Sequence, residues 1–202
     1  MPKIIDKEVK KLEILHAAMK VFAHKGILNT KMIDIANEAR VGKGTIYEYF
    51  RSKDEIFITA YQYVFTEANN NLTEALQTTS DPVKKLELVL NITFDSFMGH
   101  SGEFAAIMMD FWAEGVRRKD SKVLDAFNLK GVYTEYRALV SSILQEGIKK
   151  GIFRDMDVNL VSSAFLGTLD GLALQWIIDP GAVNLQKVPA VILDGFLNGI
   201  KY

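Results

Sequence analysis

The chain has 202 residues, a formal net charge of −1 at pH 7 and no cysteine. Its composition, with 49% hydrophobic and 24% charged residues, is that of an ordinary folded protein and not of a disordered one. The lack of cysteine excludes disulfide bonds, thiolate metal sites and a cysteine nucleophile. This length suffices to bury a substantial core, in one large domain or in a small domain joined to a larger one.

No targeting or membrane-spanning segment is expected. The N-terminal residues MPKIIDKEVKK are charged and lack the apolar core of a signal peptide. The most apolar later stretch, 164–178, is short and is interrupted by Asp170. We therefore predict a cytoplasmic protein that has no membrane partner.

Charge is distributed unevenly along the chain. Residues 1–53 hold 11 Lys and Arg against 6 Asp and Glu, whereas the remainder holds 13 against 19. A basic N-terminal part lowers the free energy of approach to a polyanion such as DNA, and an acidic remainder does not. Segregation of this size is common, so it indicates a nucleic-acid partner only in combination with a motif.

The spacing of apolar residues predicts an all-α fold. Apolar side chains recur every three or four residues, and the chain contains only four prolines. About nine helices are expected, over residues 7–24, 32–39, 43–50, 52–77, 82–99, 103–118, 121–149, 157–178 and 184–201.

Local capping signals support several of these bounds. Gly26 follows the first helix, where a left-handed C-terminal cap is expected. Thr30 is a candidate cap for the second helix. Ser52 and Glu55 have the spacing of a capping box that opens the fourth helix.

The stretch from Thr30 to Lys53 predicts two short helices joined by a tight turn, which is the pattern of a helix-turn-helix for duplex DNA. In this motif the second helix lies in the major groove and the first braces it against the DNA backbone. The predicted contacts carry small, hydroxylated, aromatic or basic side chains: Thr30, Lys43, Gly44, Thr45, Tyr47, Tyr49 and Lys53.

Each residue type in this set suits a part of DNA. Gly44 has no side chain, so the start of the helix can approach the groove closely. The hydroxyl groups of Thr45, Tyr47 and Tyr49 can reach bases or phosphates, and lysines pair with phosphates. Ile46 belongs to the core instead, as does Phe50. The alternative interpretation is that the polar groups are ordinary surface residues of two amphipathic helices.

Residues 9–57 resemble the DNA-binding head of the TetR family of transcriptional regulators. The matching positions are Ile14, Leu15, Ala17, Ala18, Val21, Phe22, Lys25, Gly26, Thr30, Ile35, Ala36, Ala39, Val41, Lys43, Gly44, Thr45, Ile46, Tyr47, Tyr49, Phe50, Ser52, Lys53, Asp54 and Glu55.

Two positions depart from the family pattern. Arg40 stands where the turn usually has glycine, and Gly42 stands where a small hydroxylated residue commonly caps the recognition helix. A glycine displaced by two residues lets the turn take a different path, and Arg40 then becomes a further phosphate contact.

The resemblance implies a homodimer that reads a palindromic operator and a C-terminal part that senses a small molecule, usually to release DNA. We therefore expect an N-terminal three-helix DNA-binding domain over 1–53, joined within the helix 52–77 to a helical ligand-binding and dimerisation domain over 54–202. The resemblance also implies that helices 157–178 and 184–201 pair across the dimer. The alternative is that their apolar residues pack inside one subunit.

The effector is expected to be a small hydrophobic or amphipathic molecule. Aromatic and methionine side chains suit an adaptable apolar cavity, although each one alone is more often part of a core. A carboxylate such as Asp170, if it faces that cavity, favours a cationic or hydroxylated ligand. The candidate ligand residues are Phe97, His100, Phe104, Met108, Phe111, Trp112, Tyr133, Tyr136, Asp170 and Trp176.

Two other classes of function fit less well. Glu13 and His16 have the Glu-x-x-His spacing of helical di-iron sites, but the chain lacks a second copy of it, a Gly-rich phosphate loop and a Gly-x-Ser-x-Gly elbow. We therefore predict no enzyme, no catalytic residue, no metal and no cofactor. A DNA-architectural protein without an effector is the second alternative. The prediction is a ligand-responsive transcriptional regulator, most often a repressor.

Overall fold

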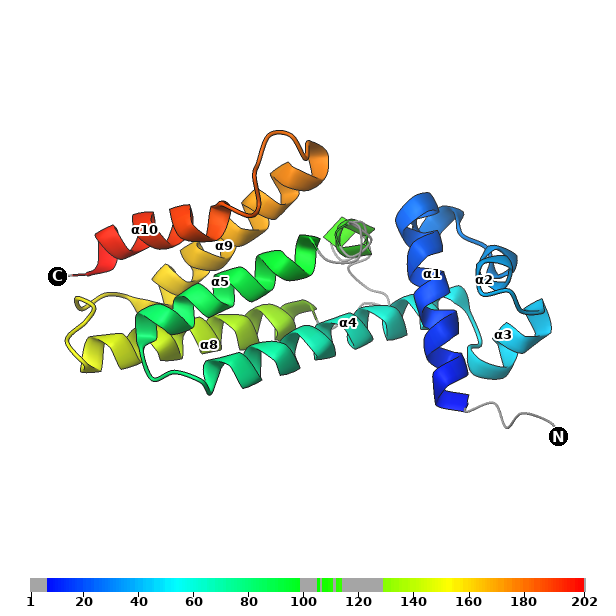
Figure 1. The fold of residues 1–202 in the computed structure, drawn as a ribbon, viewed down its shortest axis with the longest axis horizontal. Helices are drawn as coiled ribbons and strands as arrows, with labels where there is room; N and C mark the ends of the chain where they lie inside the picture. The colour runs from blue at the N-terminus through cyan, green and yellow to red at the C-terminus, as the bar shows by residue number, and fades with distance from the viewer. Residues whose placement is uncertain (1–6, 99–104, 106, 111, 114–128, 202) are drawn as a thin grey trace. The chain divides into compact units, whose positions relative to one another are not determined.

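The computed structural model describes residues 7–98, 105, 107–110, 112–113 and 129–201, except for the side chains at positions 97 and 98. Within these residues the fold is all-α, as predicted, and the one β-type pairing is an isolated bridge between Phe153 and Lys201. The helices of Figure 1 are α1 Lys7–Asn29, α2 Met32–Glu38, α3 Lys43–Tyr49, α4 Lys53–Leu76, α5 Pro82–Met98, α8 Leu129–Lys149, α9 Val158–Ile178 and α10 Val188–Ile200.

Two predicted helices fall partly outside the described residues. Of the helix expected over 103–118, the described positions 105, 107–110 and 112–113 are helical. Of the helix expected over 121–149, the described part is α8. The last helix begins at Val188 and not at residue 184, because residues 184–187 form a turn and the proline that follows lacks the N–H of an interior helical residue.

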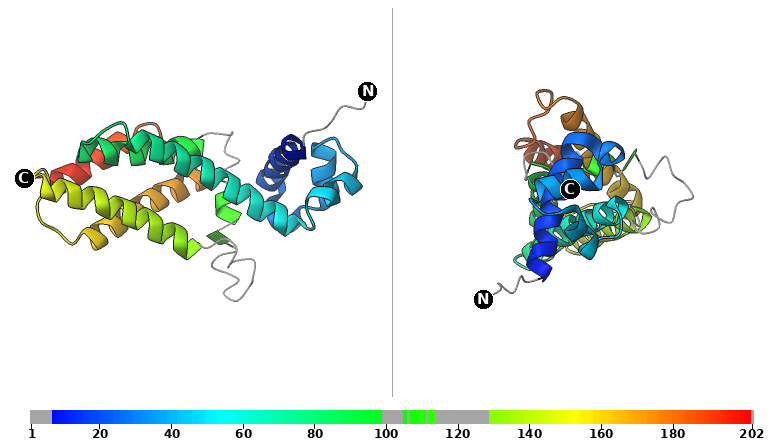
Figure 2. Two further views of the ribbon diagram at one scale, coloured as in Figure 1. Left: turned by 90° about the horizontal axis from the view of Figure 1, so that it is seen from below. Right: turned by 90° about the vertical axis from the view of Figure 1, so that its right-hand side faces the viewer.

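The chain divides into two compact units. The first, unit 1, comprises the described residues of Met1–Thr66 and Gly99–Phe127, and the second, unit 2, those of Glu67–Met98 and Asn128–Tyr202. The division falls inside α4, which continues as one helix from Lys53 to Leu76 (Figure 2).

Unit 1 packs α1, α2, α3 and the start of α4 around an aromatic and aliphatic core. The rings of Phe22 and Phe57 meet edge to face with centroids 5.3 Å apart. Ile46 and Phe50 are both buried, as predicted, so α3 is anchored by its apolar side. The burial of these side chains supplies the hydrophobic free energy that a seven-residue helix lacks on its own.

The helix starts in this unit use side chains partly as predicted. The hydroxyl oxygen of Ser52 accepts the backbone N–H of Glu55 at 3.1 Å, whereas the Glu55 carboxylate accepts the N–H of Arg51 at 2.7 Å. Thr30 does not cap α2. The cap position is Lys31, whose N–H donates to Asp34 Oδ2 at 2.9 Å.

The turn between α2 and α3 contains a residue in the left-handed conformation that is not a glycine. Arg40 has φ of +53°. Gly42, at the N-cap position of α3, has φ of −66°, a value that any residue can adopt. The N–H of Val41 donates to Ala36 O at 3.0 Å and the N–H of Arg40 to Asn37 O at 3.2 Å, which are the two bonds of a Schellman motif. The expectation that the glycine had moved the turn is therefore wrong, because the turn keeps its left-handed position with an arginine there.

Unit 2 contains the rest of α4 with α5, α8, α9 and α10. Its core is aliphatic and aromatic, and an edge-to-face contact of 5.1 Å joins the rings of Phe165 in α9 and Phe196 in α10. Asp157 caps α9 by accepting the N–H groups of Asn159 and Leu160 at 3.1 and 3.0 Å. Fully buried side chains come from several helices: Leu86, Val89, Leu90, Phe94, Val140, Leu144, Phe165 and Ala173.

Candidate functional sites

The exposed side of α3 carries most of the predicted DNA contacts. Lys43 and Gly44 are exposed, Tyr47 is 49% exposed, and Thr45 and Tyr49 are half-buried. The Lys43 ammonium lies over the Tyr47 ring, 5.8 Å from its centroid. Basic, aromatic and hydroxyl groups are thus displayed on the side of α3 opposite its buried anchors.

The two predicted contacts that flank this helix are engaged within the protein. Thr30 is 2% exposed, and its hydroxyl donates to the carbonyl of Gly26 at 2.8 Å. The Lys53 ammonium donates to the carbonyls of Ile27, Leu28 and Thr30 at 2.7, 3.0 and 3.1 Å. A phosphate contact by Lys53 stays a prediction, and it requires the ammonium to leave some of these carbonyls.

The segment 25–31, which we call the α1–α2 junction, is also held by an acidic residue distant in sequence. Gly26 has φ of +71° and ψ of 157°, so it interrupts the helical hydrogen bonding. The N–H of Ile27 donates to Asp110 Oδ2 at 2.6 Å. Nearby, the Lys25 ammonium and the Lys31 N–H, which both bond the Asp34 carboxylate, hold the pKa of that group below its ordinary value.

The role of Asp110 could not be predicted from the sequence. The hydrogen bond joins residues 83 positions apart, so no local spacing announces it. The only available signal was Gly26, which indicated a left-handed break in α1 and hence an N–H that needs an acceptor.

The candidate ligand residues fall in three groups. Phe97, His100, Phe104 and Phe111 lie outside the described side chains. Met108 and Trp112 belong to unit 1, where Met108 is buried and the Trp112 Nε1 atom is buried without a hydrogen-bond partner. The remaining four belong to unit 2: Tyr133, Tyr136, Asp170 and Trp176.

Two surface grooves of unit 2 contain none of these candidates. One, of about 320 Å³, lies between α4, α5 and α8, and the other, of about 310 Å³, lies between α5 and α10. The first is lined at one end by the ion pair of Lys85 and Glu146, whose atoms are 2.6 Å apart. Glu146 also pairs with Lys150 at 2.7 Å, and the two ammonium groups lower the pKa of its carboxyl group.

Several polar contacts join α8 to α9, and we call the three shortest of them the α8–α9 seam. The Tyr133 hydroxyl donates to Asp170 Oδ2 at 2.8 Å, and Arg137 Nε donates to Ser163 Oγ at 2.9 Å. The third contact joins the hydroxyl oxygens of Ser141 and Ser162 at 2.9 Å. The α8 members are four residues apart, so they lie along one face of that helix.

Asp170 differs electrostatically from the other members of the seam. Burial raises the pKa of its carboxyl group, and the hydrogen bond from Tyr133 opposes that rise. Among the described residues, no lysine or arginine forms an ion pair with Asp170. Burial also raises the pKa of the Tyr136 hydroxyl.

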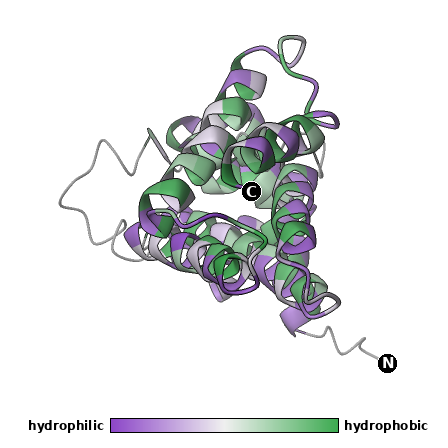
Figure 3. Ribbon diagram, turned by 90° about the vertical axis from the view of Figure 1, so that its left-hand side faces the viewer, coloured by the Kyte–Doolittle hydropathy of each residue, from purple (hydrophilic) through white to green (hydrophobic). Residues whose placement is uncertain are grey.

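Helices α9 and α10 expose apolar side chains to an unusual extent. Leu160 and Ile178 of α9 are 68% and 74% exposed, and Val191 of α10 is 71% exposed. A Cβ atom added to the four glycines of these helices, Gly167, Gly171, Gly195 and Gly199, meets nothing within 4 Å. In contrast, Val188, Ile192 and Ile200 of α10 are buried within one copy. Figure 3 shows how hydrophobic positions recur among hydrophilic ones along the helices of this unit.

By length and composition alone, α9 could cross a membrane, since it has 21 residues with a mean hydropathy of 1.3 over its most apolar window. Such helices also occur in proteins that have no membrane contact, so this property does not contradict the sequence prediction.

Two family models match the chain. Residues 14–60 match the model described as bacterial regulatory proteins, tetR family, and residues 82–197 match the model described as BetI-type transcriptional repressor, C-terminal. The second match includes Asp110 and the whole α8–α9 seam.

Curated relatives match over nearly their full length. The chain is 26% identical over 197 residues to the fatty acid metabolism regulator protein of Bacillus subtilis, covering 96% of this chain and 97% of that protein. It is 24% identical over 196 residues to the HTH-type transcriptional regulator BetI of Agrobacterium fabrum, covering 97% and 90%.

Solved structures share the fold. A transcriptional regulator from Saccharomonospora viridis, crystallised in complex with choline, has a TM-score of 0.86 at 21% identity and covers 97% of this chain and 100% of its own. The regulator FadR from Bacillus subtilis, in complex with stearoyl-CoA, has a TM-score of 0.77 at 26% identity, with coverage of 94% and 98%.

Proposed function

Given that the chain belongs to the TetR family of transcriptional regulators, we propose that two copies bind a palindromic operator in the cytoplasm and that a small effector releases them. The family and its relatives are ligand-responsive regulators of transcription, not enzymes. The observation that carries the proposal is the exposed polar side of α3, which stands over the buried side chains of Ile46 and Phe50.

The recognition helix has the chemistry for groove contact. Lys43 supplies a positive charge for phosphate, and Thr45 has a hydroxyl and a methyl group that suit base edges. Tyr47 presents a ring and a hydroxyl on the exposed side of the helix. Gly44 meets no atom within 4 Å of an added Cβ, so the backbone there is open to DNA.

The exposed apolar residues of α9 and α10 support dimerisation through these two helices. An apolar side chain such as Ile178 or Val191 gains hydrophobic free energy when a second copy covers it. Glycines in both helices permit a close approach of two backbones. A two-fold dimer then reads two half-sites one helical turn of DNA apart, roughly 34–36 Å, or a multiple of it.

The relatives support a small amphipathic effector. The regulator from Saccharomonospora viridis was crystallised with choline and FadR from Bacillus subtilis with stearoyl-CoA, and both ligands combine apolar and charged parts. For this chain we assign the effector to unit 2, where the seam contains the candidate residues Tyr133 and Asp170 and where α8 also carries Tyr136.

The test is a footprint of the purified protein on DNA next to its own gene, with excess competitor DNA. We expect one protected palindrome. Tyr47→Ala should weaken operator binding by about 1–3 kcal/mol, because the ring and the hydroxyl leave the interface. Tyr47→Phe separates the hydroxyl from the ring, and Lys20→Ala, at an exposed position of α1, is the matched surface control. Diffuse protection without a palindrome contradicts the proposal and favours a DNA-architectural protein.

The dimer is tested separately by analytical ultracentrifugation. Val191→Glu places two like charges in an apolar interface and should yield monomers, with loss of operator protection at low protein concentration. Val9→Glu changes an exposed valine of α1, 53% exposed against 71% for Val191, and should leave the dimer intact. A dimer that survives Val191→Glu unchanged excludes α10 from the interface.

A further inference from the structure

We propose that Glu48 reads a cytosine in the major groove, so that each half-site of the operator contains a C·G pair whose cytosine N4 amine donates to the Glu48 carboxylate. The inference rests on the proposed operator binding and adds the base that one named side chain recognises. It begins from the position of Glu48 on α3.

Glu48 lies at the centre of the exposed side of α3. It is two residues from each of the buried anchors, Ile46 and Phe50. Successive residues of an α-helix are about 100° apart around its axis, so Glu48 lies about 160° away from both anchors. Its side chain is exposed. Glu48 therefore faces directly any surface that the exposed side of α3 meets.

Gly44 shares this direction and lets α3 come close to DNA. It precedes Glu48 by four residues, which places the two on the same face, one helical turn apart. A Cβ atom added to Gly44 meets nothing within 4 Å, so the helix has no bulk at this point. A helix that lies in the major groove on this face brings the Glu48 side chain toward base edges and not toward the phosphates of the rim.

The Glu48 carboxylate is free to accept hydrogen bonds from DNA. Among the described residues, no ion pair or hydrogen bond holds its side chain. The Lys43 ammonium, on the preceding turn, lies instead over the Tyr47 ring, 5.8 Å from its centroid. A donor on a base edge therefore does not compete with a partner inside the protein.

A carboxylate on this face is unfavourable for DNA binding unless it meets a donor. Duplex DNA is a polyanion, and a negative charge on the binding surface raises the free energy of association. Removal of the carboxylate from water without a new hydrogen bond raises that free energy further. Direct acceptance of a hydrogen bond in the groove offsets both costs, and it makes the offset depend on the base.

An ionised carboxylate selects one base in the major groove because it can only accept hydrogen bonds. Guanine presents the acceptors N7 and O6 there, and thymine presents the acceptor O4. Adenine presents its N6 amine beside the acceptor N7, whereas cytosine presents the N4 amine alone. Cytosine N4 is thus the donor that has no acceptor beside it on the same base.

The first test is a base-substitution scan of the operator that footprinting defines. Each base pair is changed in both half-sites at once, and affinity is measured by fluorescence anisotropy for the wild type and for Glu48→Ala. We expect one position at which the wild type prefers cytosine by at least about tenfold and Glu48→Ala has no preference, with all other preferences unchanged. If Glu48→Ala keeps every preference, or loses one for another base, the inference is overturned.

The second test changes what the side chain recognises. Glu48→Gln has nearly the same shape but carries a donor as well as an acceptor, and this pair matches N7 and N6 of adenine. We expect its preference at the same position to move from cytosine to adenine. A variant that does not fold cannot acquire a new preference, so this result is independent of stability. Retention of the cytosine preference by Glu48→Gln contradicts the inference.

The third test removes the proposed donor from DNA and leaves the protein unchanged. N4-methylcytosine keeps the amine proton that pairs with guanine and replaces the proton that faces the major groove. At the identified position it should weaken binding of the wild type but not of Glu48→Ala. Equal losses for the two proteins show that methylation acts through the DNA alone, and they overturn the inference.

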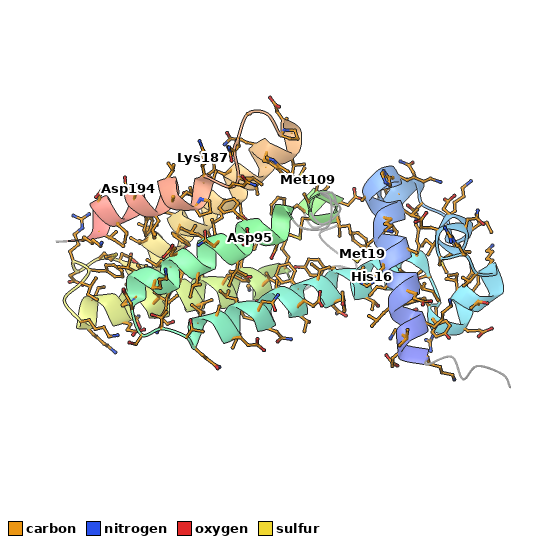
Figure 4. The ribbon with its side chains drawn as sticks, viewed as in Figure 1. His16, Met19, Asp95, Met109, Lys187 and Asp194 are labelled. Atoms are coloured by element: carbon orange, nitrogen blue, oxygen red, sulfur yellow. The ribbon has the colours of Figure 1, made fainter. Side chains whose placement is uncertain are left out.

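Two control variants separate base recognition from charge. Glu38→Gln removes an exposed carboxylate from α2 in unit 1, and Asp95→Asn removes one from α5 in unit 2 (Asp95 is labelled in Figure 4). Loss of a negative charge by itself should act on the affinity for all sequences alike and leave base preferences unaltered. If either control loses the cytosine preference, charge alone produces the effect and the inference is overturned.

The footprint separates failure of this inference from failure of the proposed function. If the wild type protects no palindrome, the proposed function fails and the inference fails with it. If a palindrome is protected but Glu48→Ala keeps all base preferences, the repressor stands and the role of Glu48 is refuted. A cytosine preference that depends on Glu48 supports both.

Discussion

The α1–α2 junction and the α8–α9 seam each hold a carboxylate through one neutral donor, but the junction is also held by a lysine ammonium. At the junction Asp110 accepts a backbone N–H at 2.6 Å and the Lys53 ammonium donates to three carbonyls. In the seam Asp170 accepts a single hydroxyl. The junction therefore combines a carboxylate and an ammonium group, both bonded to backbone atoms, whereas the seam bonds its carboxylate to a side-chain hydroxyl.

This difference predicts opposite signs for the same kind of substitution. Removal of a charged group from the junction leaves backbone donors or acceptors without partners, which destabilises the fold. Removal of the charge from the seam relieves a desolvated carboxylate and leaves its neutral hydrogen bond in place. Stability measurements can therefore tell a residue that supports the fold by its charge from one that supports it only by a neutral hydrogen bond.

The largest effect is expected for Lys53→Met, which keeps the aliphatic part of the side chain and removes the ammonium. Three carbonyls of the junction then lose a charged donor, so the free energy of unfolding should fall by about 2–3 kcal/mol in chemical denaturation. Lys20→Met, at an exposed position of α1, should change it by less than about 0.5 kcal/mol. If both variants lose the same unfolding free energy, the Lys53 ammonium does not stabilise the junction.

Asp110→Ala should have the next largest effect, about 1–2 kcal/mol of unfolding free energy, because the Ile27 N–H loses its acceptor. Asp110→Asn retains an oxygen acceptor without the charge and should lose less. Operator affinity, measured by fluorescence anisotropy, should decline in the same order, since the junction positions the start of α2. If operator affinity does not follow this order, the junction does not position α2 for DNA binding.

The smallest change in the free energy of unfolding is expected for Glu146→Gln. This variant changes a carboxylate of unit 2 that is paired with two lysines. The lysine partners lower the folded-state pKa of Glu146, so its stabilisation is complete above the unfolded value of 4.5 and disappears as the pH falls through the folded-state value. At pH 7 the variant should lose about 0.5 kcal/mol, and the loss should vanish in acid. Stabilisation at pH 7 by this variant would contradict a stabilising role of the two ion pairs of Glu146.

Local features of the fold could be predicted from the sequence because their causes are local. The burial of Ile46 and Phe50 follows from helical periodicity, and the Ser52 cap follows from spacing. The left-handed Arg40 was not predicted, because an arginine gives no sign that tertiary packing will force it to positive φ. The cap of Ile27 by Asp110 required knowledge of which distant segments meet.

The candidate functional residues also divide into those whose environment follows from local sequence and those whose environment depends on distant segments. Exposure of Tyr47 on α3 follows from the period of the helix, but the internal hydrogen bonds of Thr30 and Lys53 depend on the path of the junction. Asp170 was recognised as a candidate by its residue type alone. Its hydrogen bond from Tyr133 depends on the packing of α8 against α9, which the spacing of residues along either helix does not reveal.

The hydrogen bond between Ile27 and Asp110 also affects how the chain is made. The ribosome releases the DNA-binding helices long before residue 110 emerges, because 83 positions separate donor and acceptor. Until then the last turn of α1 has an N–H with no protein acceptor and is expected to fray. A fragment that ends at residue 66 is permanently in that condition, so an excised DNA-binding head should be less ordered at the end of α1 than the same residues in the full chain.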